Sequence, residues 1–87
     1  MIINDIRYVE SDTTRKDGRY PLRIGSDVEF LVEPKIGEVM ILDYKADNQG
    51  NPKKGLLRTS VVRDMYQTET ELVIITINSI YRFNKSK

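Results

Sequence analysis

The C-terminal third of the chain carries its densest β-strand signal. The runs Leu56–Tyr66 and Leu72–Ile77 are rich in Val, Ile, Thr and Leu, and they flank the polar stretch 67–71. Side chains of this kind fit a pleated sheet, and two such runs around a polar tip are typical of a β-hairpin. A third run, Ile80–Phe83, follows a break at Asn78 and Ser79. This part of the chain predicts three antiparallel strands and an all-β fold.

Alternating apolar and polar residues predict further strands upstream. Val28–Val32 and Val39–Tyr44 show the period of two that a half-buried strand requires, and Ile6–Val9 is a shorter candidate. Residues 46–55 contain turn formers and no apolar side chain larger than alanine, so they predict an exposed loop. No segment keeps the 3.6-residue period of an amphipathic helix, so no helix is expected.

Residues 10–27 form a polar arm with a turn signal near its middle. Asp17-Gly18 is a preferred pair for a two-residue hairpin turn, because that turn needs positive φ at both central positions. Pro21 cannot donate to a strand ladder, so the returning part of the arm must lie at an edge or leave the sheet. We expect a projecting hairpin or long loop here and a frayed tail at residues 84–87, within a single domain of residues 1–87.

Together these elements predict a small antiparallel β-barrel of five or six strands. Their order, with a long first loop, a variable second loop and a tight distal hairpin, resembles the Src-homology-type barrel, a fold also used by Tudor-like proteins. The resemblance covers residues 10–83 and implies one helical turn before the last strand. It brings no functional residues, because the chain lacks tryptophan and the aromatic clusters with which signalling members bind proline-rich peptides.

A Greek-key barrel of the oligonucleotide-binding kind is the alternative fold, disfavoured because no helix is visible between strands three and four. The stretches L-R-T-S-V-V (57–62) and T-I-N-S-I-Y (76–81) resemble small proteins of bacterial and phage genomes. No established activity accompanies that resemblance.

Several chemistries are excluded by the residues that are missing. The chain has no cysteine and no histidine, which removes Ser-His and Cys-His nucleophile systems and zinc sites of ordinary ligands. It also lacks the glycine-rich phosphate loops of common nucleotide sites. The carboxylate pairs Asp43 with Asp47 and Asp12 with Asp17 are interpreted as turn formers rather than metal ligands. We therefore expect no enzyme activity, no catalytic or metal-binding residue and no cofactor.

Charge is unevenly distributed along the chain. Residues 1–44 hold 6 basic and 9 acidic side chains (net −3), while residues 45–87 hold 8 and 4 (net +4). Basic residues interleaved with an aromatic can neutralise phosphates while the ring stacks on a base. The candidate nucleic-acid contacts are Arg15, Lys16, Arg19, Tyr20, Arg23, Lys53, Lys54 and Arg58. Acidic residues within the arm oppose this interpretation, and a solvated loop is favoured.

The run Leu72–Ile77 is apolar on both faces, although a small barrel has only one interior. An exposed apolar face usually marks an association surface, which makes Val73, Ile75 and Ile77 the candidate protein interface. The favoured alternative is that the N-terminal segment, with Ile2, Ile3, Ile6 and Tyr8, folds across this face and covers it.

The leading functional prediction is a non-enzymatic protein-interaction module, as a regulator or component of a bacterial or phage system. Its partner is another protein or a second copy, since a domain of this size buries only about 60% of its unfolded surface. The alternative is a nucleic-acid-binding small barrel that uses the basic loops. The chain lacks a secretory signal and the roughly 20-residue apolar run of a membrane helix, which predicts a cytoplasmic protein with no membrane partner. Whether the basic groups converge in space decides between the two functions.

Overall fold

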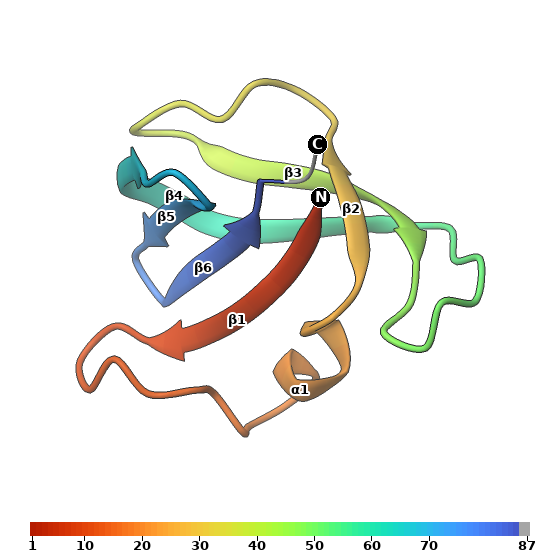
Figure 1. Ribbon diagram of the computed structural model, residues 1–87. Helices are drawn as coiled ribbons and strands as arrows, with labels where there is room; N and C mark the ends of the chain where they lie inside the picture. Colours follow the sequence, from red (N-terminus) through yellow and green to blue (C-terminus); the bar gives the residue numbers. More distant parts are fainter. Residues whose placement is uncertain (86–87) are drawn as a thin grey trace.

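Six antiparallel strands close into a ring in the computed structural model, which describes residues 1–85 (Figure 1). The elements are β1 Ile2–Tyr8, α1 Tyr20–Arg23, β2 Asp27–Phe30, β3 Val39–Ala46, β4 Leu56–Gln67, β5 Glu71–Thr76 and β6 Ser79–Asn84. Each strand pairs with the next along the chain, and β6 pairs with β1 to close the ring. The all-β barrel prediction is confirmed, with six strands. This sequential order differs from a Greek key, in which a long connection changes the order of neighbours, so the alternative fold was wrong.

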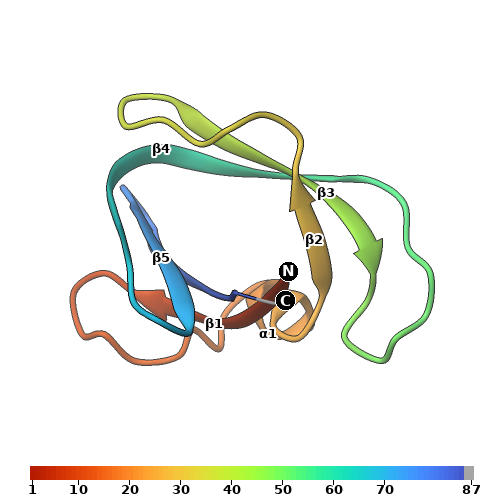
Figure 2. The ribbon, with the colours of Figure 1, turned by 45° about the horizontal axis from the view of Figure 1, so that its top comes forward.

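The long strand β4 joins the two halves of the barrel. Its first part pairs with β3 as far as Val39↔Val61, and its second part pairs with β5 from Val62↔Thr76 onward. The register shifts between Val39 and Ile41 and again between Val62 and Asp64. Such bulges bend a strand and increase its twist. Figure 2 shows the result, because β4 curves from β3 on one side of the ring to β5 on the other.

Alternate residues of the strands fill the barrel interior. Met40, Leu42 and Tyr44 form one buried face of β3, as the alternation predicts. Ile74 and Phe83 are fully buried, and the ring of Phe83 packs edge-on against Phe30 with centroids 5.6 Å apart. The other buried apolar residues are Ile3, Ile6, Val28, Leu57, Val62, Val73 and Tyr81.

The N-terminal segment is a full barrel strand. β1 pairs with β6 at six register positions from Ile2↔Asn84 to Tyr8↔Ser79, whereas only Ile6–Val9 was predicted as a strand. Ile3 and Ile6 point into the core. The expectation that this segment covers the outer face of β5 was therefore wrong. Pairing with β6 is favoured because it satisfies main-chain groups that would otherwise form an open sheet edge.

The polar arm, expected to be a projecting hairpin or a long loop, is a loop that contains the helical turn α1, and it has no hairpin at Asp17-Gly18. The chain reverses earlier, where the Tyr8 amide donates to the Thr13 carbonyl at 2.8 Å and Asp12 adopts a φ of 56°. Pro21 lies in the first turn of α1, where its missing N–H needs no partner. A four-residue helix is too short to show a helical period, so no helix was predicted here. Within residues 1–85 no helix is long and apolar enough to cross a membrane.

The end of the chain is held by the hairpin of β4 and β5. Asn84 is the last residue of β6, and the Lys85 amide donates to the Thr70 carbonyl at 2.9 Å. The remaining two residues of the predicted tail lie outside the described residues. Before β6 the chain makes a short bend, in which the Thr76 hydroxyl donates to the Ser79 carbonyl at 3.0 Å, where the resemblance implied a helical turn.

Replacing Ile74 with alanine is expected to lower the free energy of unfolding by about 2–5 kcal/mol, because it leaves a cavity in the barrel core. The matched control is Ile77→Ala in the same hairpin, where the side chain is 51% exposed and the loss is expected to stay below about 1 kcal/mol. Urea unfolding followed by circular dichroism measures both. Equal losses at the two sites would contradict the assignment of Ile74 to the core.

Candidate nucleic-acid interface

A groove with a volume of about 280 Å³ lies between α1, the loop that follows β3, and the start of β4. Figure 1 shows α1 and this loop on the same side of the barrel. Half of the ten lining residues are basic and none is acidic. The five basic residues, which define the basic groove, are Arg19, Arg23, Lys53, Lys54 and Arg58. Five of the eight candidate contacts from the sequence therefore converge in space.

Local structure explains why these side chains face the groove. Arg19 immediately precedes α1 and Arg23 is its last residue, and residues four apart lie on the same side of a helical turn. The loop after β3 returns antiparallel to that strand, since the Lys53 amide donates to the Lys45 carbonyl at 3.3 Å. Arg58 is exposed on β4 between two buried residues, as strand alternation requires.

The arm and the loop touch directly at Gly25. This residue has a φ of +94°, and a Cβ placed there would lie 3.1 Å from the Cβ of Asn48. Glycine suits both requirements, because it tolerates positive φ and permits close approach. The contact fixes the separation of the two basic segments, and neither residue carried a sequence signal for this role.

The floor of the groove is aromatic and apolar. Tyr44 is 7% exposed, and the Nζ of Lys53 lies 4.1 Å from the centroid of its ring. Burial raises the pKa of Tyr44, and the nearby positive charge of Arg23 partly opposes that change. Strand alternation places Tyr44 on the buried face of β3, but its contact with Lys53 depends on how the loop folds back, which a local pattern does not contain.

The five basic groups keep their charge available. Among residues 1–85, none of them forms an ion pair with a carboxylate. Arg7, Arg15 and Arg82, by contrast, each contact an acidic side chain within 2.7 Å. A cluster of unpaired cations raises the local positive potential and attracts anions.

Arg15 and Tyr20 lie outside the lining of the basic groove, and both make internal contacts. Arg15 donates from Nε and Nη2 to both carboxylate oxygens of Asp17, at 3.0 and 2.6 Å. These bonds lower the pKa of Asp17 to about 2. The ring of Tyr20 is covered by Arg15 at 4.0 Å and Arg23 at 5.1 Å from its centroid. Lys16 is exposed and lies outside the lining of the basic groove.

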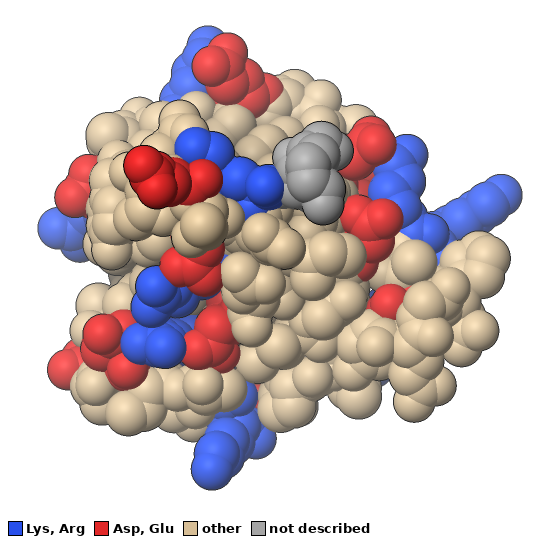
Figure 3. All heavy atoms as spheres, viewed as in Figure 1, with Lys and Arg blue, Asp and Glu red and all other residues tan. Residues whose placement is uncertain are grey.

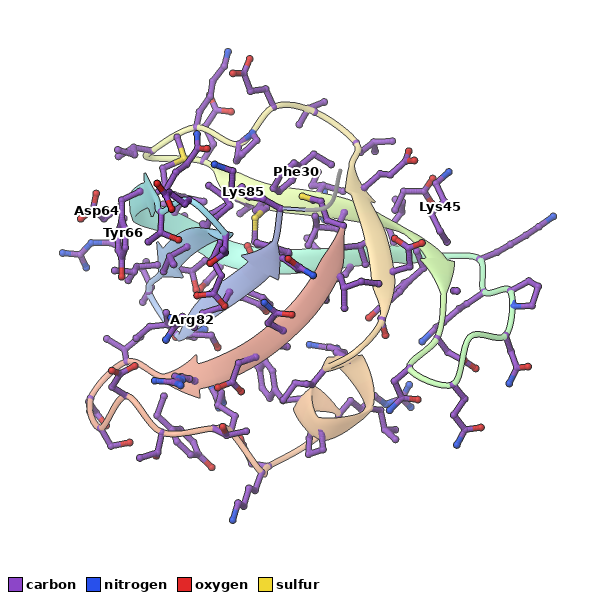
Figure 4. All side chains as sticks on the ribbon, viewed as in Figure 1. Phe30, Lys45, Asp64, Tyr66, Arg82 and Lys85 are labelled. Atoms are coloured by element: carbon purple, nitrogen blue, oxygen red, sulfur yellow. The ribbon has the colours of Figure 1, made fainter. Side chains whose placement is uncertain are left out.

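The three residues of the predicted apolar interface differ in how exposed they are. Val73 is 2% exposed, because it lies in register between Tyr66 on β4 and Arg82 on β6, which Figure 4 labels. Ile75 is partly buried, and only Ile77 is half exposed. On the face seen in Figure 3, acidic and basic side chains lie side by side. The three residues therefore do not form one open patch.

The acidic pairs have internal partners. Asp47 accepts hydrogen bonds from the amides of Gln49 and Asn51 at 2.9 Å each, which lowers its pKa and closes a turn. Asp43 pairs with Lys45 at 3.3 Å, and Asp12 pairs with Arg7 at 3.3 Å. In the described part of the chain, no three acidic residues gather as metal ligands.

Stability is expected to fall as the pH rises above about 10, where a tyrosine in the unfolded chain loses its proton. Burial raises the pKa of Tyr81 to about 12, so the folded protein keeps this proton longer. The loss of stability is complete only above the pKa of Tyr81 in the folded protein. The difference between the folded and unfolded pKa values corresponds to about 3 kcal/mol in the free energy of unfolding. Urea unfolding from pH 8 to 11.5 should show a shallower decline for Tyr81→Phe than for the exposed-site control Tyr66→Phe. Identical profiles for both variants would contradict the prediction.

No protein-family model, curated protein or solved structure matches this chain.

Proposed function

We propose that this protein is a non-enzymatic nucleic-acid-binding module that holds a sugar-phosphate backbone in the basic groove. The convergence of five basic side chains without carboxylate partners, within residues 1–85, carries this proposal. They come from two segments about 30 residues apart, which the fold brings to one side of the barrel. Lysine and arginine are the usual partners of phosphate oxygens, and such contacts supply most of non-specific affinity.

A polymer fits the distribution of charge better than a single anion does. A second hollow of about 430 Å³ shares Tyr44, Lys53 and Lys54 with the basic groove. It is also lined by Lys45 and Asp43, which pair with each other at 3.3 Å. Within residues 1–85, Lys53 and Lys54 therefore supply the free positive charge that both hollows share. A chain of evenly spaced phosphates can occupy both hollows, whereas one phosphate occupies only one.

Recognition by this surface is expected to be independent of base sequence. Stacking on a base needs an accessible aromatic face, but Tyr20 is covered by two guanidinium groups and Tyr44 is buried beneath Lys53. Contacts to phosphates position a protein without identifying bases. The formal net charge of +1 also favours modest affinity at physiological salt.

The combined variant Lys53→Ala, Lys54→Ala, Arg58→Ala tests the proposal. Each lost phosphate contact removes close to one unit from the slope of log affinity against log salt, so the slope should fall by about two to three units. Fluorescence anisotropy with oligonucleotides of unrelated sequence, between 20 and 200 mM salt, measures it. Lys16→Ala, outside the groove, should keep the wild-type slope. An unchanged slope in the combined variant would place binding elsewhere.

A second candidate is the protein-interaction module, and a row of apolar residues on the outer face favours it. Val39 is opposite Val61 in register, and the Ile77 amide donates to the Val61 carbonyl at 3.0 Å. Paired residues share a face, so the three side chains form a row across β3, β4 and the end of β5. Val39 and Ile77 are 39% and 51% exposed.

We propose a second copy of the chain as the partner for this row. A two-fold interface is self-complementary, so the same patch contacts itself on both copies. Glu38, next to Val39 in sequence, and Arg63, two residues after Val61, are both exposed and provide charges of opposite sign that two copies can pair. The cytoplasmic location and the role in a bacterial or phage system remain proposals that rest on the sequence.

Ile77→Asp is expected to shift the protein from dimer to monomer, because a charge at the centre of an apolar interface is desolvated without a partner. Sedimentation equilibrium over a hundredfold range of concentration measures the change. Leu22→Asp, at an exposed position in α1, is the control and should leave the dimer intact. A wild-type protein that stays monomeric at the highest concentration would exclude this interface.

A further inference from the structure

Arg15 connects three separate parts of the molecule. Its Nη1 donates to the Asn78 carbonyl at 2.7 Å and to the Ser79 hydroxyl at 2.9 Å, in the bend before β6. Its Nε and Nη2 bind both oxygens of Asp17 in the arm. The same guanidinium lies 5.0 Å from the ring centroid of Tyr8 and 4.0 Å from that of Tyr20. The side chain is only 14% exposed, so little of it remains to contact a ligand.

These contacts attach the start of α1 to the barrel. Tyr20 is the first residue of α1, and its ring is packed between Arg15 and Arg23 and against the core. The other end of α1 is attached through Gly25, whose amide donates to the Ile3 carbonyl at 2.7 Å. One helical turn cannot hold its own shape in water, because nucleation is unfavourable. The orientation of α1 therefore depends on these two attachments.

We propose that Arg15 is a positioning residue that orders α1 before a ligand arrives, so that Arg19 and Arg23 already face Lys53 and Lys54. This inference rests on the proposed nucleic-acid function of the basic groove. A preordered groove binds more tightly because the ligand does not have to fix the arm at the moment of binding. Arg15 itself contacts no phosphate, which separates its role from that of the five groove residues.

Two measurements on the full chain test this role. Arg15→Lys keeps the charge but loses the planar fork that binds Asp17 and the bend together. Its affinity for a single-stranded oligonucleotide should fall about five- to tenfold at fixed salt, while the salt slope stays at the wild-type value. Arg23→Ala is the contrasting variant, and it should lower the slope by about one unit. Urea unfolding identifies the fraction of each variant that is folded.

Hydrogen exchange supplies a readout that does not need a ligand. The Ile24 amide donates to the Tyr20 carbonyl at 3.2 Å within α1, and it should exchange about tenfold faster in Arg15→Lys, while the Ile74 amide in β5 keeps its wild-type rate. Asp17→Asn weakens the same contact by changing the partner of Arg15, and it should raise the exchange rate of the Ile24 amide by a smaller factor.

The outcomes separate the positioning role from the proposed function. An Arg15→Lys variant with wild-type affinity and wild-type exchange would overturn the inference. A third variant, Arg15→Met, removes the charge as well as the planar fork. If it lowers the salt slope by one unit, as Arg23→Ala does, the inference is also overturned, because Arg15 would then contact phosphate directly. Faster exchange at Ile24 in Arg15→Lys, together with a wild-type protein that binds no oligonucleotide, would support the attachment of α1 and refute the nucleic-acid function.

Discussion

The pairing of β1 with β6 is the contact on which the rest of the structure depends. It closes the ring, and it brings Ile3 and Ile6 into the core beside residues from the other end of the chain. It also fixes both ends of the polar arm. The arm leaves β1 at Tyr8, and it returns where the Ile3 amide donates to the Ser26 carbonyl at 3.0 Å. Because both ends are held by the same strand, α1 is kept next to β1.

The charges of the molecule fall into two groups with different consequences. Asp5, Asp17 and Glu71 each bind an arginine. Hydrogen bonds lower the pKa of each carboxyl group, and for Glu71 the bond from Asn4 comes before that from Arg82. For Asp5, burial raises the pKa, and the hydrogen bonds from Arg7, Thr14 and the Ile6 amide together outweigh it. Of the acidic residues in the arm, Asp12 pairs with Arg7 and Asp17 pairs with Arg15, while Glu71, outside the arm, pairs with Arg82. The cations of the basic groove are left without such partners within residues 1–85, which is why a near-neutral chain still has a basic surface.

Much of the fold was predictable because strand periodicity is a local property. Five of the six strands were placed within two residues of their ends, and the buried face of β3 followed from alternation alone. β1 was underestimated because Asn4 and Asp5 interrupt its pattern at a bulge between Ile3 and Asp5. The turn α1 was missed because four residues are too few for a helical period. Its stability comes from contacts with distant residues, which a local pattern does not contain.

For the candidate site, the sequence by itself determined the supply of basic residues and the absence of Ser-His and Cys-His nucleophile systems and of thiolate ligands. It also predicted that the polar arm and the loop with Lys53 are exposed. Tertiary structure decided which of those residues act together. Arg19 and Arg58 are 39 positions apart (58 − 19), and they share a groove because ring closure confines the arm and Gly25 permits its contact with Asn48. Arg15, with the same chemistry as Arg19, is withdrawn from that group by Asp17 and the bend before β6. The reason is that charge belongs to each residue, whereas convergence depends on main-chain pairing between segments far apart in sequence.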